Sequence, residues 1–311
     1  MKVIRANVLG FCMGVRRAVR LAYTEAERSA KTRSVFTLGP LIHNPQVLED
    51  LRLRGVETLD ESGLPEDLGG VSVIIRAHGV SIETEYELRR RKAVLTDATC
   101  PRVKACQLKA RALAEAGYML FLAGEKSHAE LVGILSYAKT GALIRREKHP
   151  ENVRPCVVVG NAAEAERIAA RLHREIPELR ETGTKTALIG QTTISEDEYG
   201  AIADAIAGYF PDLQIARTIC AATKERQDSL RELLDKVDAI VVAGGKESAN
   251  TRRLFAIAEA TGKPPGKPAV LAETARDIPE EFFGFETVGI AAGASTPDTV
   301  IDEIERALTS G

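Results

Sequence analysis

Three cysteines of this chain share a position that suits a metal site. Cys12, Cys100 and Cys220 each follow a short apolar run and precede a stretch with helical periodicity. Cysteine thiolates are the usual ligands of iron–sulfur clusters, and most clusters take four of them. Three thiolates on a [4Fe-4S] cube would leave one iron open to a substrate, much as catalytic zinc sites keep an open position.

Each cysteine taken alone has simpler interpretations. A lone cysteine is most often a small buried apolar residue, and a cysteine at a helix start can instead act as a nucleophile. The same position in three parts of the chain favours a shared site. Cys106 falls inside a predicted helix and Cys156 opens a predicted strand, so both are interpreted as structural.

Further polar side chains lie in the loops that follow predicted strands. Ligands of open α/β sheets bind outside the carboxyl ends of the strands, so these loops are the expected site. Each histidine or hydroxyl could also be a helix cap or a satisfied core residue. The candidates are His43, His78, His128, Glu130, Thr192, Ser248, Asn250 and Ser295.

The elements that must position these residues alternate between strands and helices. Short runs rich in Val and Ile alternate with longer amphipathic stretches, a pattern typical of an α/β fold with buried parallel strands. Strands are predicted at residues 2–9, 35–39, 71–77, 93–99, 119–124, 142–146, 156–160, 186–190, 214–217, 239–245, 269–272 and 287–293.

The order of cysteines and polar loops predicts three similar α/β domains in a pseudo-three-fold arrangement. Each third of the chain opens with one of the three cysteines and then supplies two more polar loops. The expected domains are residues 13–98, residues 99–215, and residues 216–296 with the N-terminal strand 1–12. A C-terminal helix is expected over residues 297–311.

Composition narrows the class of protein. The chain has 311 residues, 44% of them hydrophobic and 28% charged, as in an ordinary globular protein. A net charge of −2 gives no reason to expect nucleic acid or an anionic membrane as a partner. Neither a membrane span nor a signal peptide is recognisable, so a cytoplasmic location is expected. Dinucleotide and P-loop fingerprints are absent from the sequence.

Eight short motifs occur in one order along the chain. They are "GFCMGVRRAV", "IHNPQV", "AHGV", "DATCPRV", "SHAE", "QTTIS", "CAATKERQ" and "GASTPD". Together they resemble the 4-hydroxy-3-methylbut-2-enyl diphosphate reductase family, also called IspH or LytB. The resemblance runs from near residue 3 to near residue 305.

The resemblance implies a fold and a reaction. The family forms a trefoil of three α/β domains around a central iron–sulfur cluster. It converts an allylic alcohol diphosphate to isopentenyl and dimethylallyl diphosphate in the non-mevalonate isoprenoid pathway, with two electrons, two protons and loss of water. An external one-electron donor, ferredoxin or flavodoxin, is expected.

The resemblance also implies residue roles. Cys12, Cys100 and Cys220 match the ligands of one [4Fe-4S] cluster with an open iron, which oxidation would convert to [3Fe-4S]. Glu130 matches the proton-delivering glutamate, Thr192 the threonine beside the substrate hydroxyl, and His128 a histidine of the same cavity. Substrate-binding residues are implied at His43, His78, His128, Ser248, Asn250 and Ser295.

Two positions depart from the family pattern. Ala249 stands where a second serine usually precedes the asparagine, so one diphosphate contact is expected to be missing. Ala129 replaces the usual proline between His128 and Glu130, which removes a restraint on φ.

Two other functions fit parts of this pattern. A cluster-bearing sensor or non-catalytic binder would keep the cysteines but would need neither Glu130 nor Thr192. A quinolinate synthase-like dehydratase could share a three-fold, three-cysteine plan, but the motifs around His128, Thr192 and Ser295 disfavour it.

Overall fold

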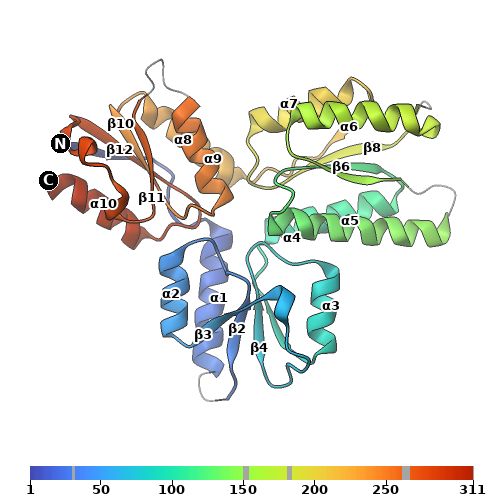
Figure 1. The fold of residues 1–311 in the computed structure, drawn as a ribbon, viewed down its shortest axis with the longest axis horizontal. Coiled ribbons are helices and arrows are strands. Elements are labelled where there is room, and N and C mark those ends of the chain that lie inside the picture. Colours follow the sequence, from blue (N-terminus) through green and yellow to red (C-terminus); the bar gives the residue numbers. More distant parts are fainter. Residues whose placement is uncertain (30–31, 150–153, 181–183, 261–266, 311) are drawn as a thin grey trace. The chain divides into compact units, whose positions relative to one another are not determined.

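The computed structural model describes residues 1–29, 32–149, 154–180, 184–260 and 267–310, shown in Figure 1. These residues form an α/β fold with three parallel sheets. The chain divides into two compact units. The first comprises Met1–Leu64, Gly70–Ala77 and Ala221–Gly311, and the second comprises Pro65–Gly69 and His78–Cys220.

One sheet of the first unit combines both ends of the chain. Its parallel strands run in the order β1-β12-β10-β11, so the first strand pairs with the last. The strands are β1 (Lys2–Arg5), β10 (Ala239–Ala243), β11 (Ala269–Ala272) and β12 (Thr287–Ala292).

Helices cover both faces of this sheet, as Figure 1 shows. The helices are α8 (Ala221–Leu234), α9 (Ala249–Ala260) and α10 (Asp298–Ser310). Val241 of β10 packs in a cluster with Ile301 of α10. Its neighbour Val242 packs with Leu230 of α8 and Leu254 of α9. Successive side chains of a strand point to opposite faces, which explains why every residue of β10 is buried.

The other sheet of the first unit holds the strands around His43 and His78. Strands β2 (Val35–Leu38), β3 (Val56–Leu59) and β4 (Ser72–Ile75) pair in parallel in the order β3-β2-β4. Helices α1 (Met13–Ser29) and α2 (Pro45–Leu53) belong to the same unit.

The second unit is built on the sheet β7-β6-β8-β9, which is also parallel. Its strands are β6 (Met119–Ala123), β7 (Cys156–Val159), β8 (Thr186–Gly190) and β9 (Gln214–Ile215). Helices α4 (Pro101–Glu115) and α5 (Ala129–Lys148) lie on one face in Figure 1, with α6 (Ala162–Glu175) and α7 (Glu196–Ala207) on the other. Helix α3 (Ile82–Arg90) and strand β5 (Val94–Asp97) also belong to this unit.

One predicted strand is wrong, and one observed strand was not predicted. Residues 142–146 lie inside helix α5, where Leu143 is 58% exposed. A short apolar run cannot distinguish a strand from part of a helix, and Gly141, which directly precedes this run, lies inside α5 and does not form a turn. Strand β3 was missed because its sequence "VETL" has only four residues, of which the middle two are polar, so it is neither an apolar run nor an alternating one. The predicted three-domain boundaries stay a prediction.

The described helices include none with both the length and the apolar composition that a bilayer span requires.

Close packing of α4 on α5 leads to the first prediction. A Cβ atom added at Gly141 of α5 would lie 2.2 Å from the Arg111 carbonyl oxygen of α4. Gly141→Ala is therefore expected to destabilise the protein by about 1–3 kcal/mol, the usual cost of overpacking. Gly200→Ala in α7 is the matched control because nothing lies within 4 Å of its added Cβ. Urea unfolding of both variants tests this, and equal stabilities would contradict the close α4–α5 contact.

Candidate active site

The three strand-end cysteines all lie directly before helices. Cys12 precedes α1, Cys100 precedes α4 and Cys220 precedes α8. Each is partly buried. Cys12 lies in the first unit and the other two lie in the second, and the convergence of all three stays a prediction.

The remaining two cysteines have different surroundings. Cys106 lies within α4 and is 5% exposed, and burial raises the pKa of its thiol to about 12. Cys156 opens strand β7, and burial raises the pKa of its thiol to about 11. The thiolate is the form that binds metals, so burial disfavours metal ligation by these two thiols.

Other groups of the second unit also act on the pKa of Cys106. After burial, the largest cause of its raised pKa is the charge of Glu130, and the thiols of Cys100 and Cys220 act in the same direction.

Glu130 and Thr192 form a buried pair in this unit. Glu130 is 2% exposed and Thr192 is 5% exposed. The Thr192 backbone N–H donates to Glu130 Oε1 at 2.6 Å, and the Thr192 hydroxyl donates to Oε2 at 3.0 Å. Each carboxylate oxygen thereby accepts a hydrogen bond from Thr192. Glu130 uses these oxygens on Thr192 and does not cap its own helix, where His128 is the capping residue.

His128 caps the start of helix α5. Its Nδ1 accepts the Glu130 backbone N–H at 3.2 Å. A nitrogen that accepts carries no proton, so the neutral ring of His128 must bear its proton on Nε2. The His78 ring meets the His128 ring edge to face, with centroids 5.1 Å apart.

Gln191 links the loops of this site, although the sequence did not single it out. It is fully buried, and its Oε1 accepts the Glu125 backbone N–H at 3.0 Å. Its Nε2 donates to the Thr193 hydroxyl at 3.1 Å. Gln191 thus ties the loop before α5 to the loop that carries Thr192. Its place directly after a predicted strand, within "QTTIS", was the signal available in the sequence.

Buried hydroxyl and amide side chains lie close together in the first unit. Ser248, Asn250 and Ser295 are 5–6% exposed. The Ser295 hydroxyl is 3.3 Å from the Ser248 hydroxyl and 3.4 Å from the His43 carbonyl oxygen. Asn250 Nδ2 is buried with no hydrogen-bond partner among the described residues.

The loop after β12 joins these residues to Cys12. The Cys12 backbone N–H donates to the Ala294 carbonyl at 3.1 Å, and the next residue is Ser295. Within the first unit, one loop therefore contacts both a predicted metal ligand and the cluster of hydroxyl groups.

The helix-cap interpretations hold for some of the candidates. Ser248 does cap α9, because its hydroxyl accepts the Thr251 backbone N–H at 3.3 Å. Thr192 does not cap α7, since Ser195 fills that role. Asn44 caps α2 and Ser81 caps α3, so the nearby His43 and His78 are not the caps of these helices.

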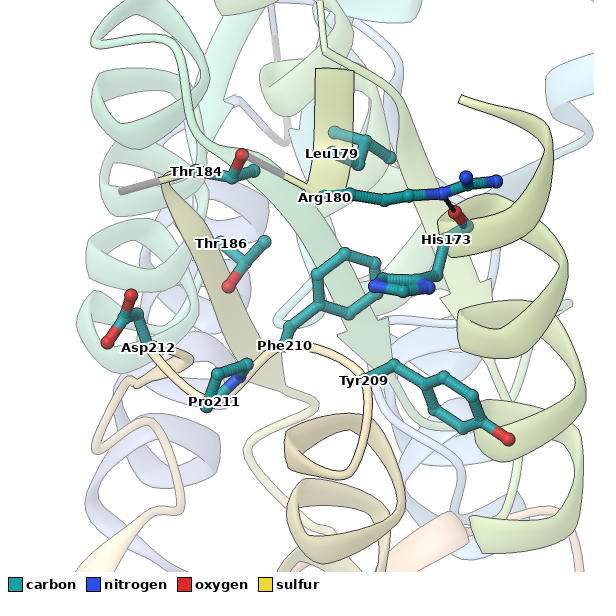
Figure 2. Close-up of a pocket in the computed structure, with 9 residues that line it drawn as sticks. All are labelled: His173, Leu179, Arg180, Thr184, Thr186, Tyr209, Phe210, Pro211 and Asp212. Atoms are coloured by element: carbon teal, nitrogen blue, oxygen red, sulfur yellow. Dashed lines mark hydrogen bonds between the residues drawn. The ribbon is translucent and has the colours of Figure 1, made fainter. Parts of the chain in front are cut away.

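A separate cavity of about 260 Å³ lies in the second unit (Figure 2). The predicted site residues do not line it. Thr186, the first residue of β8, is one of its walls, so the cavity lies toward the amino end of that strand. Glu130 and Thr192 follow the carboxyl ends of β6 and β8, and the cavity is therefore not the candidate active site.

Comparisons with known proteins agree with the motifs. The family model described as "LytB protein" matches residues 3–309. A 4-hydroxy-3-methylbut-2-enyl diphosphate reductase of Treponema denticola is 42% identical, with all of both chains covered. One of Aquifex aeolicus is 37% identical over 97% of this chain and 94% of the relative.

Solved structures give the same result. A structure of (E)-4-hydroxy-3-methyl-but-2-enyl diphosphate reductase, the terminal enzyme of the non-mevalonate pathway, matches with a TM-score of 0.67 and 34% identity over all of both chains. The reductase of Plasmodium falciparum matches with a TM-score of 0.81 over 99% of this chain and 88% of that one; at 24% identity it supports the fold alone. The chain therefore belongs to the LytB protein family.

Proposed function

We propose that this chain reduces 4-hydroxy-3-methylbut-2-enyl diphosphate to isopentenyl and dimethylallyl diphosphate. The reaction consumes two electrons and two protons and releases the substrate hydroxyl as water. The observation that supports it most is the buried Glu130–Thr192 pair in the unit that holds Cys100 and Cys220, in a chain of the LytB family. A cluster-bearing sensor would need no such proton-transfer pair.

The chain's thiols fit an iron–sulfur cluster. Cys12, Cys100 and Cys220 would hold it, while Cys106 and Cys156 have raised pKa values that suit protonated thiols. The three proposed ligands stand at helix starts, where the helix dipole favours negative charge on the sulfur. When bound, a [4Fe-4S] cluster with three cysteine ligands supplies electrons and a Lewis-acidic iron for the substrate oxygen.

Glu130 and Thr192 supply the proton. Hydroxide is a poor leaving group, so the leaving oxygen must gain a proton as its bond to carbon breaks. The Thr192 hydroxyl donates to Glu130 Oε2 at 3.0 Å. A protonated Glu130 would instead donate to Thr192, and the threonine hydrogen would then be available to the leaving oxygen.

Asn250, Ser248 and Ser295 bind the diphosphate. The buried Asn250 amide needs an acceptor, and a phosphate oxygen meets that need. The serine hydroxyls next to it can donate to the same anion, and the start of α9 adds backbone N–H groups. Ala249 lies at this helix start without the hydroxyl that the family usually has there.

Substitutions in this group should weaken substrate binding more than turnover. Asn250→Ala removes a charge-assisted hydrogen bond of about 1.5–3 kcal/mol, so KM should rise about tenfold or more with a small change in kcat. Ala249→Ser should lower KM or leave it unchanged. Steady-state kinetics of both variants provide the measurement. A clear rise in KM for a folded Ala249→Ser variant would contradict this placement of the diphosphate.

Electrons come from an external one-electron carrier, which we expect to be ferredoxin or flavodoxin, in the cytoplasm. No nucleic acid or membrane is part of this function. The proposed activity is tested by incubating anaerobically purified protein with the allylic diphosphate and a reduced one-electron donor, followed by product analysis. Formation of both isopentenyl and dimethylallyl diphosphate is expected. Absence of both products from protein that carries its iron would refute the activity.

A further inference from the structure

Arg226 is a buried cation in the second turn of helix α8. The residue is only 4% exposed. Nη1 donates to the Ala222 carbonyl oxygen at 2.8 Å, and Nη2 donates to the Gly10 carbonyl oxygen at 2.7 Å. Ala222 lies in the first turn of α8, and Gly10 lies two residues before Cys12.

This arrangement suits an arginine and little else. Burial of a charge is costly unless its donors are satisfied, and two carbonyl oxygens in fixed positions match the planar, forked guanidinium. Gly10 adopts a φ of +75°, which favours glycine, and a Cβ there would lie 2.9 Å from Asp298 Oδ1. The direction of the Gly10 carbonyl is thus set by a residue that cannot easily be replaced.

Hydrogen bonds anchor residues 8–12, the segment that leads to Cys12. The Val8 N–H donates to Ser229 Oγ at 3.1 Å, the Gly10 carbonyl accepts from Arg226, and the Cys12 N–H donates to the Ala294 carbonyl. Ser229 and Arg226 both belong to α8. Helix α8 therefore provides two of these three anchors, and the bond from Arg226 is the shorter one and is charge-assisted.

We propose that Arg226 is a positioning residue that fixes the Cys12 thiol for metal ligation. Its guanidinium connects the segment that leads to Cys12 with the first turn of α8, the helix that begins directly after Cys220. The role of Cys12 as a metal ligand rests on the proposed function. The hydrogen bond by which Arg226 holds the segment before Cys12 is independent of that function.

The test compares the rate of Cys12 alkylation in metal-free protein. Arg226→Gln removes the charged fork and should loosen the loop, so iodoacetamide should modify Cys12 about ten- to hundredfold faster, the range expected for losing a charge-assisted hydrogen bond. Peptide mass spectrometry reports each cysteine separately. Cys106 and Cys156 should react at unchanged rates, which shows that the rest of the fold is intact.

Two further variants make the result decisive. Arg231→Gln is the matched control on the same helix, because its side chain is 41% exposed and pairs with Asp228; it should leave the Cys12 rate unchanged. Arg226→Lys keeps the charge but cannot present the planar fork, and it should accelerate Cys12 alkylation even if Arg226→Gln fails to fold. An unchanged Cys12 rate in folded Arg226→Lys or Arg226→Gln protein would overturn the proposal.

A separate readout distinguishes this proposal from the proposed function. Reconstituted Arg226→Lys should lose iron to a chelator faster than the unmodified protein if Cys12 is a ligand. If Cys12→Ser keeps full iron, the ligand assignment fails, while a faster Cys12 alkylation in the Arg226 variants would still establish the positioning role.

Discussion

Glu130→Gln is expected to lower kcat at least about 100-fold, the smallest loss typical of a missing general acid. Glutamine keeps the shape of the side chain and can still accept the Thr192 backbone N–H, which now donates to Oε1 at 2.6 Å. Its amide cannot release a proton to the leaving oxygen. Substrate affinity should change little, because the residues proposed to bind the diphosphate lie on other loops.

Anaerobic measurement of kcat and substrate affinity tests this expectation. Glu147→Gln serves as the control, since Glu147 lies in the last turn of the same helix and is exposed. Near-normal turnover of Glu130→Gln would show that Glu130 does not deliver the proton and only holds Thr192 in place. The proton source would then have to be His128 or a water molecule.

Cys12→Ser, Cys100→Ser and Cys220→Ser should each lose the visible absorption of the cluster and most of the iron. A serine hydroxyl is far harder to ionise than a thiol and is a poor ligand for iron in such clusters. Cys106→Ser and Cys156→Ser should retain iron. Burial raises the pKa values of their thiols, to about 12 and about 11.

Iron and sulfide analysis of the five purified variants, with absorption spectra recorded anaerobically, provides the comparison. Full iron and full activity in any one of the first three would refute the three-thiolate site. Loss of iron in a folded Cys106→Ser variant would contradict the assignment of the buried thiol of α4 to a structural role.

The sequence predicted the fold class through features that are local in the chain. Val- and Ile-rich runs such as the one ending at Ala243 are buried on both faces, and this burial gives parallel strands their continuous apolar pattern. The three parallel sheets and the family are confirmed. The error at residues 142–146 arose because a run of that length fits either type of element, and only the packing of α5 decides between them.

The candidate site was predicted as a set of residues but not as a set of contacts. Glu130 and Thr192 were both singled out, yet they lie 62 positions apart and nothing local in the sequence predicts their two hydrogen bonds. Gln191 and Arg226 were not singled out, because their importance comes from burial and from partners distant in sequence. The metal and substrate roles of the predicted residues stay predictions.

The central claim, that three particular thiols hold the cluster, is tested most directly by differential alkylation of the unmodified protein. Anaerobically purified protein is alkylated with its iron bound and again after chelation, and each cysteine peptide is quantified by mass spectrometry. Cys12, Cys100 and Cys220 should be protected only while iron is bound, and Cys106 of α4 and Cys156 of β7 should each react at the same rate in both states because neither is a proposed ligand. Iron-dependent protection of Cys106 or Cys156, or its absence at any one of the other three cysteines, would contradict the account.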